Sequence, residues 1–308
     1  MAKTKLISDF DGIWTNQNIE AEYVWNYILD AVSELSGMEK SDVDKFLSDC
    51  KKEMDNKPYE YGWFMNGSIA AYYKEDPFGD NNAIFDFINR EQSFESEFNK
   101  TITHVKDSVL KKYSSLADFS QECFMKSTGN FKAEGKLTPV DTTRKIVDML
   151  SSDNVEIVVV SNSKTEKIQY LFSKANLTVS DHTDSGNSKL RARGDARKFV
   201  IDNSYTDLPE SLEINSEFKV PLRRSSYHKI LSEEKPDFVI GDVFSLDIAL
   251  PLYLRMNDKS FTNLKVIQRV QPYTPDWVKD YLKRDEFKKI AFIVNSVDEI
   301  PELISKTK

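Results

Sequence analysis

Residues 5–15 read Lys-Leu-Ile-Ser-Asp-Phe-Asp-Gly-Ile-Trp-Thr, and this short stretch decides the fold class of the chain. Its first apolar residues are typical of the end of a buried strand, Asp9 and Asp11 follow at once, and Gly12 allows a tight turn. An ionised carboxylate is costly to remove from water without a partner, and two close together repel each other and raise a pKa. The stretch therefore indicates a bound cation or a shared proton, and with it a metal-dependent site in which carboxylates do the chemistry.

From Thr138 onward, apolar strands alternate with helical patterns. The strands expected there cover residues 155–160, 237–240, 264–267 and 290–294. Near-continuous apolar strands that alternate with helices predict a parallel sheet covered on both faces. In such sheets ligands bind beyond the carboxyl ends of the strands.

Between the first strand and Thr138 the pattern is different. Residues 16–135 show helical spacing of apolar residues and no convincing strand, so we expect an all-helical domain with hinges near 15–17 and 135–136. The α/β core then consists of 1–15 and 136–308. Within the core, residues 178–222 are polar with short alternating runs and are expected to form a small β insert.

Composition excludes several classes of protein. The chain has 308 residues, 40% hydrophobic and 30% charged, and a net charge of −8, which argues against general nucleic-acid or anionic-membrane binding. Its two cysteines, Cys50 and Cys123, exclude a disulfide framework and make a structural zinc site improbable. With no long apolar run and no signal-peptide pattern, we expect a soluble cytoplasmic protein that does not enter a membrane.

Polar residues follow three of the expected strands. Asp9 and Asp11 follow the first strand, Ser161 and Asn162 follow strand 155–160, and Asp242 follows strand 237–240, with Asp247 five residues later. If these strands are neighbours, four carboxylates and a hydroxyl meet at one edge of the sheet. A hard divalent cation such as Mg²⁺ suits oxygen ligands of this kind, and the arrangement suits phosphoryl transfer.

Together these motifs resemble the haloacid dehalogenase (HAD) superfamily of phosphohydrolases. Its DxDG motif is similar to Asp9-Phe10-Asp11-Gly12, its strand ending in Ser or Thr to residues 158–162, and its GDxxxxD motif to residues 241–247. The resemblance covers about 1–15 and 136–300, and it implies a Rossmann-like core. It also implies that the helical block 16–135, inserted after the first motif, is a C1-type cap that excludes water and selects a small phosphorylated substrate.

The resemblance further implies a role for each motif residue. Asp9 would be the nucleophile that forms an aspartyl-phosphate, and Asp11 would move the proton to the leaving oxygen and later from water. Asp9, the main-chain carbonyl of Asp11 and Asp242 would hold Mg²⁺, with Asp247 completing its shell. Ser161 and nearby groups of Asn162 would bind the phosphoryl oxygens.

The family's third motif, a lysine just before the helix that precedes the Gly-Asp strand, is not evident in this sequence. Arg224 is expected to replace it, with Lys229, Arg223 and Lys219 as further candidates. Arginine can bind phosphate through two donors, but it is not interchangeable with lysine.

Each motif also has a simpler structural explanation. The aspartate pair could form a capped turn, Ser161-Asn162-Ser163 and Asp247 could cap helices, and Arg223-Arg224 could be a solvated surface pair. The alternatives in function are a phosphotransferase or mutase, a dehalogenase of the same superfamily, or a regulatory protein that binds a phosphorylated ligand without turnover. Physiological substrate and oligomeric state stay open.

Overall fold

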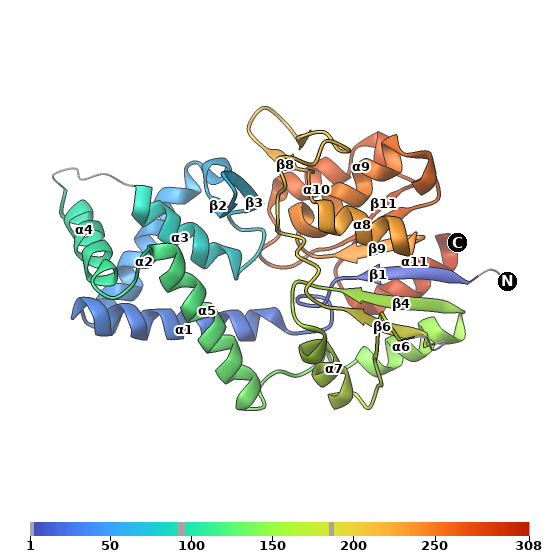
Figure 1. Ribbon diagram of the computed structural model, residues 1–308, viewed down its shortest axis with the longest axis horizontal. Coiled ribbons are helices and arrows are strands. Elements are labelled where there is room, and N and C mark those ends of the chain that lie inside the picture. Colours follow the sequence, from blue (N-terminus) through green and yellow to red (C-terminus); the bar gives the residue numbers. More distant parts are fainter. Residues whose placement is uncertain (1–2, 91–95, 185–187, 308) are drawn as a thin grey trace. The chain divides into compact units, whose positions relative to one another are not determined.

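The computed structural model describes residues 3–90, 96–184 and 188–307. Expectations that fall on 1–2, 91–95, 185–187 and 308, at the ends of the core, in the helical block and in the polar insert, lie outside the described residues. The chain divides into two compact units (Figure 1). Unit 1 comprises Met1–Asn16 and Thr138–Lys308, and unit 2 comprises Gln17–Leu137.

Unit 1 is built on a seven-stranded sheet in the order β11-β10-β9-β1-β4-β6-β5. Every neighbouring pair in this sheet is parallel, which confirms the parallel α/β core. The strands are β1 (Thr4–Ser8), β4 (Val155–Val160), β5 (Ser180–Asp181), β6 (Leu190–Arg193), β9 (Phe238–Gly241), β10 (Lys265–Arg269) and β11 (Ala291–Val294). Because β1 lies between β4 and β9, the three strands that carry the motifs are neighbours and their carboxyl ends meet at one edge.

Helices cover both faces of this sheet (Figure 1). They are α6 (Thr143–Ser152), α7 (Thr165–Lys174), α8 (Ser225–Glu234), α9 (Ala249–Asn257), α10 (Asp276–Leu282) and α11 (Ile300–Thr307). All six residues of β4 are buried, as expected for a strand covered on both sides. This rigid layer fixes the positions of the loops that leave the strand ends.

The prediction that residues 178–222 form a small polar β insert is partly wrong. Strands β5 and β6 belong to the main sheet, and only β7 (Ser211–Glu213) and β8 (Lys219–Pro221) form a separate antiparallel pair. Strand β6 looks polar because it carries Arg191 and Arg193, but acidic partners satisfy both: each contacts Glu234, and Arg191 also contacts Glu156. Ion pairing thus lets a charged segment serve as an inner strand of the sheet.

Unit 2 is mostly helical, as expected, but the prediction that it lacks strands is wrong. Its helices are α1 (Gln17–Ser36), α2 (Lys40–Asp55), α3 (Gly79–Arg90), α4 (Glu97–Leu110) and α5 (Leu116–Ala133), and β2 (Gly62–Met65) and β3 (Ser68–Tyr72) form a hairpin. Its two-residue turn is Asn66-Gly67, and both residues have positive φ angles, 52° and 80°. Asn-Gly favours this hairpin turn, so the signal was present in the sequence.

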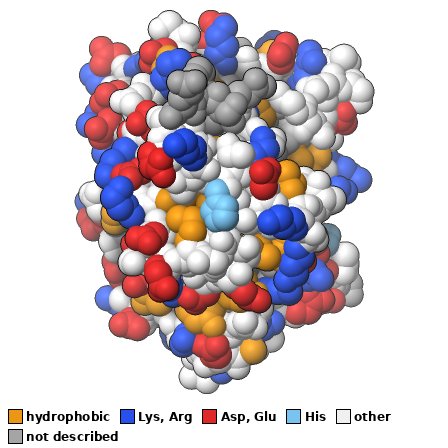
Figure 2. Space-filling view, turned by 90° about the vertical axis from the view of Figure 1, so that its left-hand side faces the viewer, with side chains coloured by type: hydrophobic (Ala, Val, Ile, Leu, Met, Phe, Trp, Pro, Cys, Tyr) orange, Lys and Arg blue, Asp and Glu red, His pale blue; other side chains and the backbone are white. Residues whose placement is uncertain are grey.

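The core of unit 2 contains a buried cluster of apolar side chains, mostly from its helices, and both cysteines lie in it as free thiols. On the face shown in Figure 2, acidic and basic side chains are interspersed and not gathered by sign. Unit 2 also has ion pairs near its surface within one helix, such as Lys45 with Asp49 and Lys126 with Glu122. Among the helices described, none is both long and apolar enough to span a bilayer.

Candidate active site

The loop after β1 places Asp9 at the centre of the sheet edge. The Asp9 main-chain N–H donates to the carbonyl of Ile240 on β9 at 2.9 Å, which continues the pairing of the two strands. Gly12 then adopts φ +72°, a conformation that favours glycine, and its N–H donates to Thr15 Oγ1 at 3.1 Å. The chain therefore turns sharply after Asp11, as the DxDG spacing indicates.

Two further aspartates come from the end of β9. Asp242 directly follows the strand, and Asp247 lies in a π-helical turn, Phe244–Ile248, that leads into α9. A Cβ atom added to Gly241 would lie 2.2 Å from the Cβ of Asp247, so only glycine lets this turn fold back over the strand end. The Val243 N–H donates to Asp247 Oδ2 at 3.1 Å and holds the carboxylate in place.

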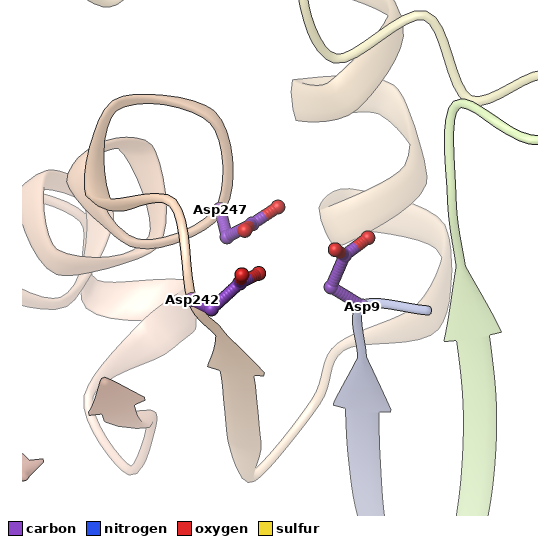
Figure 3. A group of neighbouring side chains, drawn as sticks. All are labelled: Asp9, Asp242 and Asp247. Carbon is purple, nitrogen blue, oxygen red and sulfur yellow. The ribbon is translucent and has the colours of Figure 1, made fainter. Parts of the chain in front are cut away.

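Asp9, Asp242 and Asp247 form one cluster of carboxylates. One oxygen from each lies within 4.8 Å of the others, and their side chains point toward one another from the ends of β1 and β9 (Figure 3). Asp242 and Asp247 are each only 2% exposed. Burial, together with the nearby charge of Asp247, raises the pKa of Asp9 to about 8, although Lys198 acts in the opposite direction.

Lys198 supplies the positive charge that the sequence motifs did not reveal. Its Nζ lies 2.6 Å from Asp9 Oδ1 and 2.5 Å from Asp247 Oδ1, and the residue is 2% exposed. Burial lowers the pKa of Lys198, but the charges of Asp247 and Asp9 outweigh burial and raise it, so the side chain stays protonated. The expectation that an arginine replaces the missing lysine is therefore wrong, because a lysine is present at the site.

The two predicted phosphate ligands nearest to Lys198 contact its main chain. The Lys198 N–H donates to Asn162 Oδ1 at 2.7 Å, and Arg224 Nη1 donates to the Lys198 carbonyl at 2.5 Å. Arg224 is fully buried, and its Nε donates to the Pro221 carbonyl. The structure therefore does not place Arg224 as a stand-in for lysine; it braces the loop that carries Lys198.

The remaining candidates lie in two different environments. Asp11 accepts a hydrogen bond from Ser163 Oγ at 2.9 Å, and Lys167 Nζ lies 3.3 Å from it, so its carboxylate is held beside the cluster and is not one of its three members. Ser161 Oγ accepts from the Ser163 N–H at 3.0 Å, as a capping side chain would. Lys229 is largely exposed on α8 and lies 3.9 Å from Glu233, so it is not brought to the carboxylates by any described contact.

The position of Lys198 follows from the strand that precedes it. Residues 190–193 are a strand of the main sheet, and Lys198 lies in the loop that leaves its carboxyl end. Loops at that end of a parallel sheet carry ligand-binding residues. Lys198 was missed because residues 178–222 were placed outside the sheet, and a residue outside the sheet is not expected to lie beside Asp9.

The cluster fits a hard divalent cation. Its donors are all carboxylate oxygens, and with all three ionised beside one ammonium the formal charge is −2. Isolated charge of this kind is costly in a buried site, and a divalent ion would neutralise it. Mg²⁺ prefers oxygen ligands, and it uses few carboxylates because it retains water or binds phosphate. Asp9, Asp242 and Asp247 are the residues that would hold it.

No protein-family model and no curated protein matches this chain. Among solved structures, similar chains are a 2-haloacid dehalogenase from Pseudomonas syringae pv. Tomato DC3000 (11% identity, TM-score 0.43, 100% of both chains) and CbbY from Rhodobacter sphaeroides in complex with phosphate (10%, 0.40, 97% of this chain and 96% of that one). Another is a HAD-superfamily hydrolase, subfamily IA, from Geobacter sulfurreducens PCA (11%, 0.39, 98% and 96%). These likenesses are distant, so the chain's own residues have to support any activity. The solved structures that resemble this chain include members of the superfamily that its three motifs resemble.

Proposed function

We propose that this protein is a Mg²⁺-dependent phosphohydrolase that cleaves a small phosphomonoester through an aspartyl-phosphate on Asp9. One observation carries the proposal: the carboxylates of Asp9, Asp242 and Asp247, two of them buried, cluster at the carboxyl ends of two neighbouring strands, and the buried ammonium of Lys198 contacts two of them. In phosphoryl transfer, positioning and charge neutralisation supply most of the catalysis. When bound, the cation would supply part of that neutralisation at the phosphoryl oxygens.

In the first half of the reaction, an Asp9 carboxylate oxygen attacks phosphorus and forms a new P–O bond. The bond from phosphorus to the ester oxygen breaks, and Asp11 gives its proton to that leaving oxygen. Lys198 contacts Asp9 directly and carries a fixed positive charge, so it is placed to stabilise negative charge on the transferring group.

In the second half, water attacks phosphorus and Asp11 takes the proton that the water releases. The bond between phosphorus and the Asp9 oxygen breaks, inorganic phosphate forms, and the carboxylate of Asp9 is regenerated. Ser163 and Lys167 contact the Asp11 carboxylate and fix its position for both transfers. The carboxyl group of Asp11 beside the nucleophile favours a reaction whose leaving group needs a proton. Phosphomonoester hydrolysis has such a leaving group and carbon–halogen cleavage does not, so Asp11 supports a phosphatase over a dehalogenase.

Unit 2 serves, in this proposal, as the cap that selects the substrate. Its two connections to the core run side by side within unit 1: Thr15 pairs with Pro139, and the Val140 N–H donates to the Trp14 carbonyl at 2.9 Å. Paired connections of this kind could act as a double hinge, and hinge residues are often found at such element ends.

The direct test compares the wild type with Asp9→Asn on a panel of phosphorylated metabolites and a chromogenic phosphomonoester. We expect Mg²⁺-stimulated release of phosphate by the wild type and a loss of about three orders of magnitude or more in the variant. Asp148→Asn is the matched control, because Asp148 is an exposed residue paired with Arg144 on α6. Mass spectrometry of acid-quenched protein should also find a phosphoryl group on Asp9.

The same assay separates the alternatives. Phosphate moved between positions of one sugar phosphate would indicate a mutase, and halide release would indicate a dehalogenase. Full activity in Asp9→Asn would remove the nucleophile assignment. If the wild type neither hydrolyses any ester nor binds Mg²⁺ by calorimetry, the proposed function is wrong.

A further inference from the structure

One segment with no motif residue contacts two parts of the candidate site at once. This segment, Gln268–Tyr273, comprises the end of β10 and the loop after it, and β10 pairs directly with β9. In the register of that pair, Gln268 lies opposite Gly241. The segment Gln268–Tyr273 therefore begins beside the point where the chain leaves β9 at Asp242.

The first group of contacts holds the loop that follows Asp11. Arg269 Nη1 donates to the carbonyls of Gly12 and Ile13, and Gln271 Nε2 donates to the Gly12 carbonyl at 2.6 Å. A carbonyl oxygen has two lone pairs, so the Gly12 carbonyl can accept hydrogen bonds from both Arg269 and Gln271. The direction of the DxDG turn is thus fixed from outside the motif.

The second group holds Asp242. Gln268 is fully buried, and its Nε2 donates to the Asp242 main-chain carbonyl at 2.6 Å. Tyr273 Oη donates to Asp242 Oδ2. A hydrogen bond from a hydroxyl to an ionised carboxylate is stronger than one between neutral groups, and it leaves the other carboxylate oxygen in a defined direction.

The loop that presents Tyr273 is itself a closed turn. The Thr274 N–H donates to the Gln271 carbonyl at 3.0 Å, and the Gln271 N–H donates to Thr274 Oγ1 at 2.8 Å. Pro272 occupies the second position of this turn, where its fixed φ is favourable. Tyr273 therefore reaches Asp242 from a stiff support, and holding the tyrosine there costs little entropy.

We infer that Gln268–Tyr273 is a positioning element for the cation site, in which Tyr273 sets the orientation of Asp242 as a metal ligand. The inference rests on the proposed function, since it assigns Asp242 to the cation. Residues that hold a metal ligand by hydrogen bonds orient it, and their loss typically weakens metal affinity by about 10- to 100-fold. Tyr273 is thus a positioning residue, because it acts through Asp242.

The test is calorimetric titration of the full chain with Mg²⁺ alone, comparing wild type, Tyr273→Phe and Tyr205→Phe. Tyr205 is the matched control because its hydroxyl contacts His228 Nδ1 at 2.7 Å and none of the three aspartates in any described contact. We expect the Kd for Mg²⁺ to rise about 10- to 100-fold in Tyr273→Phe and to stay within about twofold of the wild type in Tyr205→Phe. In the phosphatase assay the Mg²⁺ concentration for half-activity should rise in parallel, and saturating Mg²⁺ should restore most of kcat.

Each outcome bears on a different statement. If the wild type binds Mg²⁺ and Tyr273→Phe binds it equally well, the positioning role of Tyr273 is wrong while the proposed function stands. If the wild type does not bind Mg²⁺, the proposed function itself fails. Should Tyr273→Phe lose its native circular dichroism, Pro272→Ala takes its place: the exposed proline can be replaced without removing a side-chain hydrogen bond. A looser turn should then weaken Mg²⁺ binding several-fold, and unchanged binding would count against the inference.

Discussion

Replacing Lys198 with methionine tests the charge balance of the site most directly. Methionine keeps most of the length of the side chain and removes only the ammonium group. That group lies 2.6 Å from an Asp9 oxygen and 2.5 Å from an Asp247 oxygen, and Lys198 is fully buried. The variant therefore leaves the buried carboxylate of Asp247 and the partly buried carboxylate of Asp9 facing each other without their shared cation.

The cost can be estimated from buried ion pairs. Removing one partner of such a pair destabilises a protein by about 3–5 kcal/mol, because the remaining charge stays buried. Protonation of one of the two carboxylates limits the loss to this range. A typical domain has only about 5–15 kcal/mol of stability, so the variant should unfold at clearly lower urea concentration in EDTA.

Mg²⁺ should reverse part of this loss. In the wild type a cation at about 100 times its Kd stabilises the folded state by about 2.7 kcal/mol. In Lys198→Met the stabilisation should be larger by at least about 1 kcal/mol, because the divalent ion also relieves the repulsion that lysine relieved before. Hydrolysis should nevertheless fall about 100-fold or more, since no fixed ammonium faces the developing charge.

The assay is urea denaturation in EDTA and in saturating Mg²⁺, with phosphatase activity measured on the same samples. Lys219→Met is the control, because Lys219 is exposed on β8 and its ion pair with Glu213 should contribute less than about 1 kcal/mol. Equal stability of Lys198→Met and wild type in EDTA would refute the reasoning. So would an equal effect of Mg²⁺ on both proteins.

Two further predictions concern the frame of the core. Gly241→Ala should weaken Mg²⁺ binding by at least about tenfold and destabilise unit 1 by about 1–3 kcal/mol, because the new Cβ would lie 2.2 Å from the Cβ of Asp247. Gly129→Ala is the control, because a Cβ at Gly129 on α5 meets no other atom within 4 Å. Calorimetry and urea denaturation measure both effects, and equal behaviour of the two variants would contradict the prediction. Burial alone would raise the pKa of Glu234, but hydrogen bonds from Arg191 and Lys5 outweigh it and hold the pKa at about 2. A carboxyl whose pKa is lower in the folded state stabilises that state above its unfolded pKa of 4.5, and this contribution, about 1–2 kcal/mol after allowance for solvent screening, is lost as the pH falls from about 4.5 to about 2. In Glu234→Gln the free energy of unfolding, measured by urea denaturation, should fall less steeply between about pH 4.5 and pH 2 than in the wild type. An unchanged pH dependence would contradict the role assigned to Glu234.

The sequence predicted those parts of the fold that follow from local periodicity. Strand β4 is apolar except for Glu156, so it could be interpreted as a buried parallel strand. Strand β6 could not, because Arg191 and Arg193 make it polar and their partner Glu234 lies on a different element. The hairpin at Asn66-Gly67 was missed for another reason: its turn signal was present, but residues 58–80 were expected to form an irregular loop with short helices.

In the candidate site, sequence reasoning found the acidic residues and missed their cationic partner. Asp9 and Asp242 each follow a strand, and Asp247 belongs to the same short motif as Asp242, so order along the chain was enough to group them. Lys198 has no such spacing, because its place depends on how β6 pairs with β4. Tyr273 is hidden in the same way, since only the pairing of β10 with β9 brings it to Asp242.

The exchange of roles between Lys198 and Arg224 follows from the chemistry of the two side chains. Arginine has a planar fork of donors, and Arg224 directs it to the main-chain carbonyls of Lys198 and Pro221. Lysine is a compact charge on a flexible stem, so in the proposed reaction the Lys198 ammonium would stay beside Asp9 while negative charge moves from the carboxylate to a phosphoryl oxygen. In the proposed site, the buried Arg224 therefore holds the loop that carries Lys198, and the buried Lys198 faces the reacting group. Sequence alone could not distinguish these roles, because both residues are basic and both lie outside the spaced motifs at 9–12, 158–162 and 241–247.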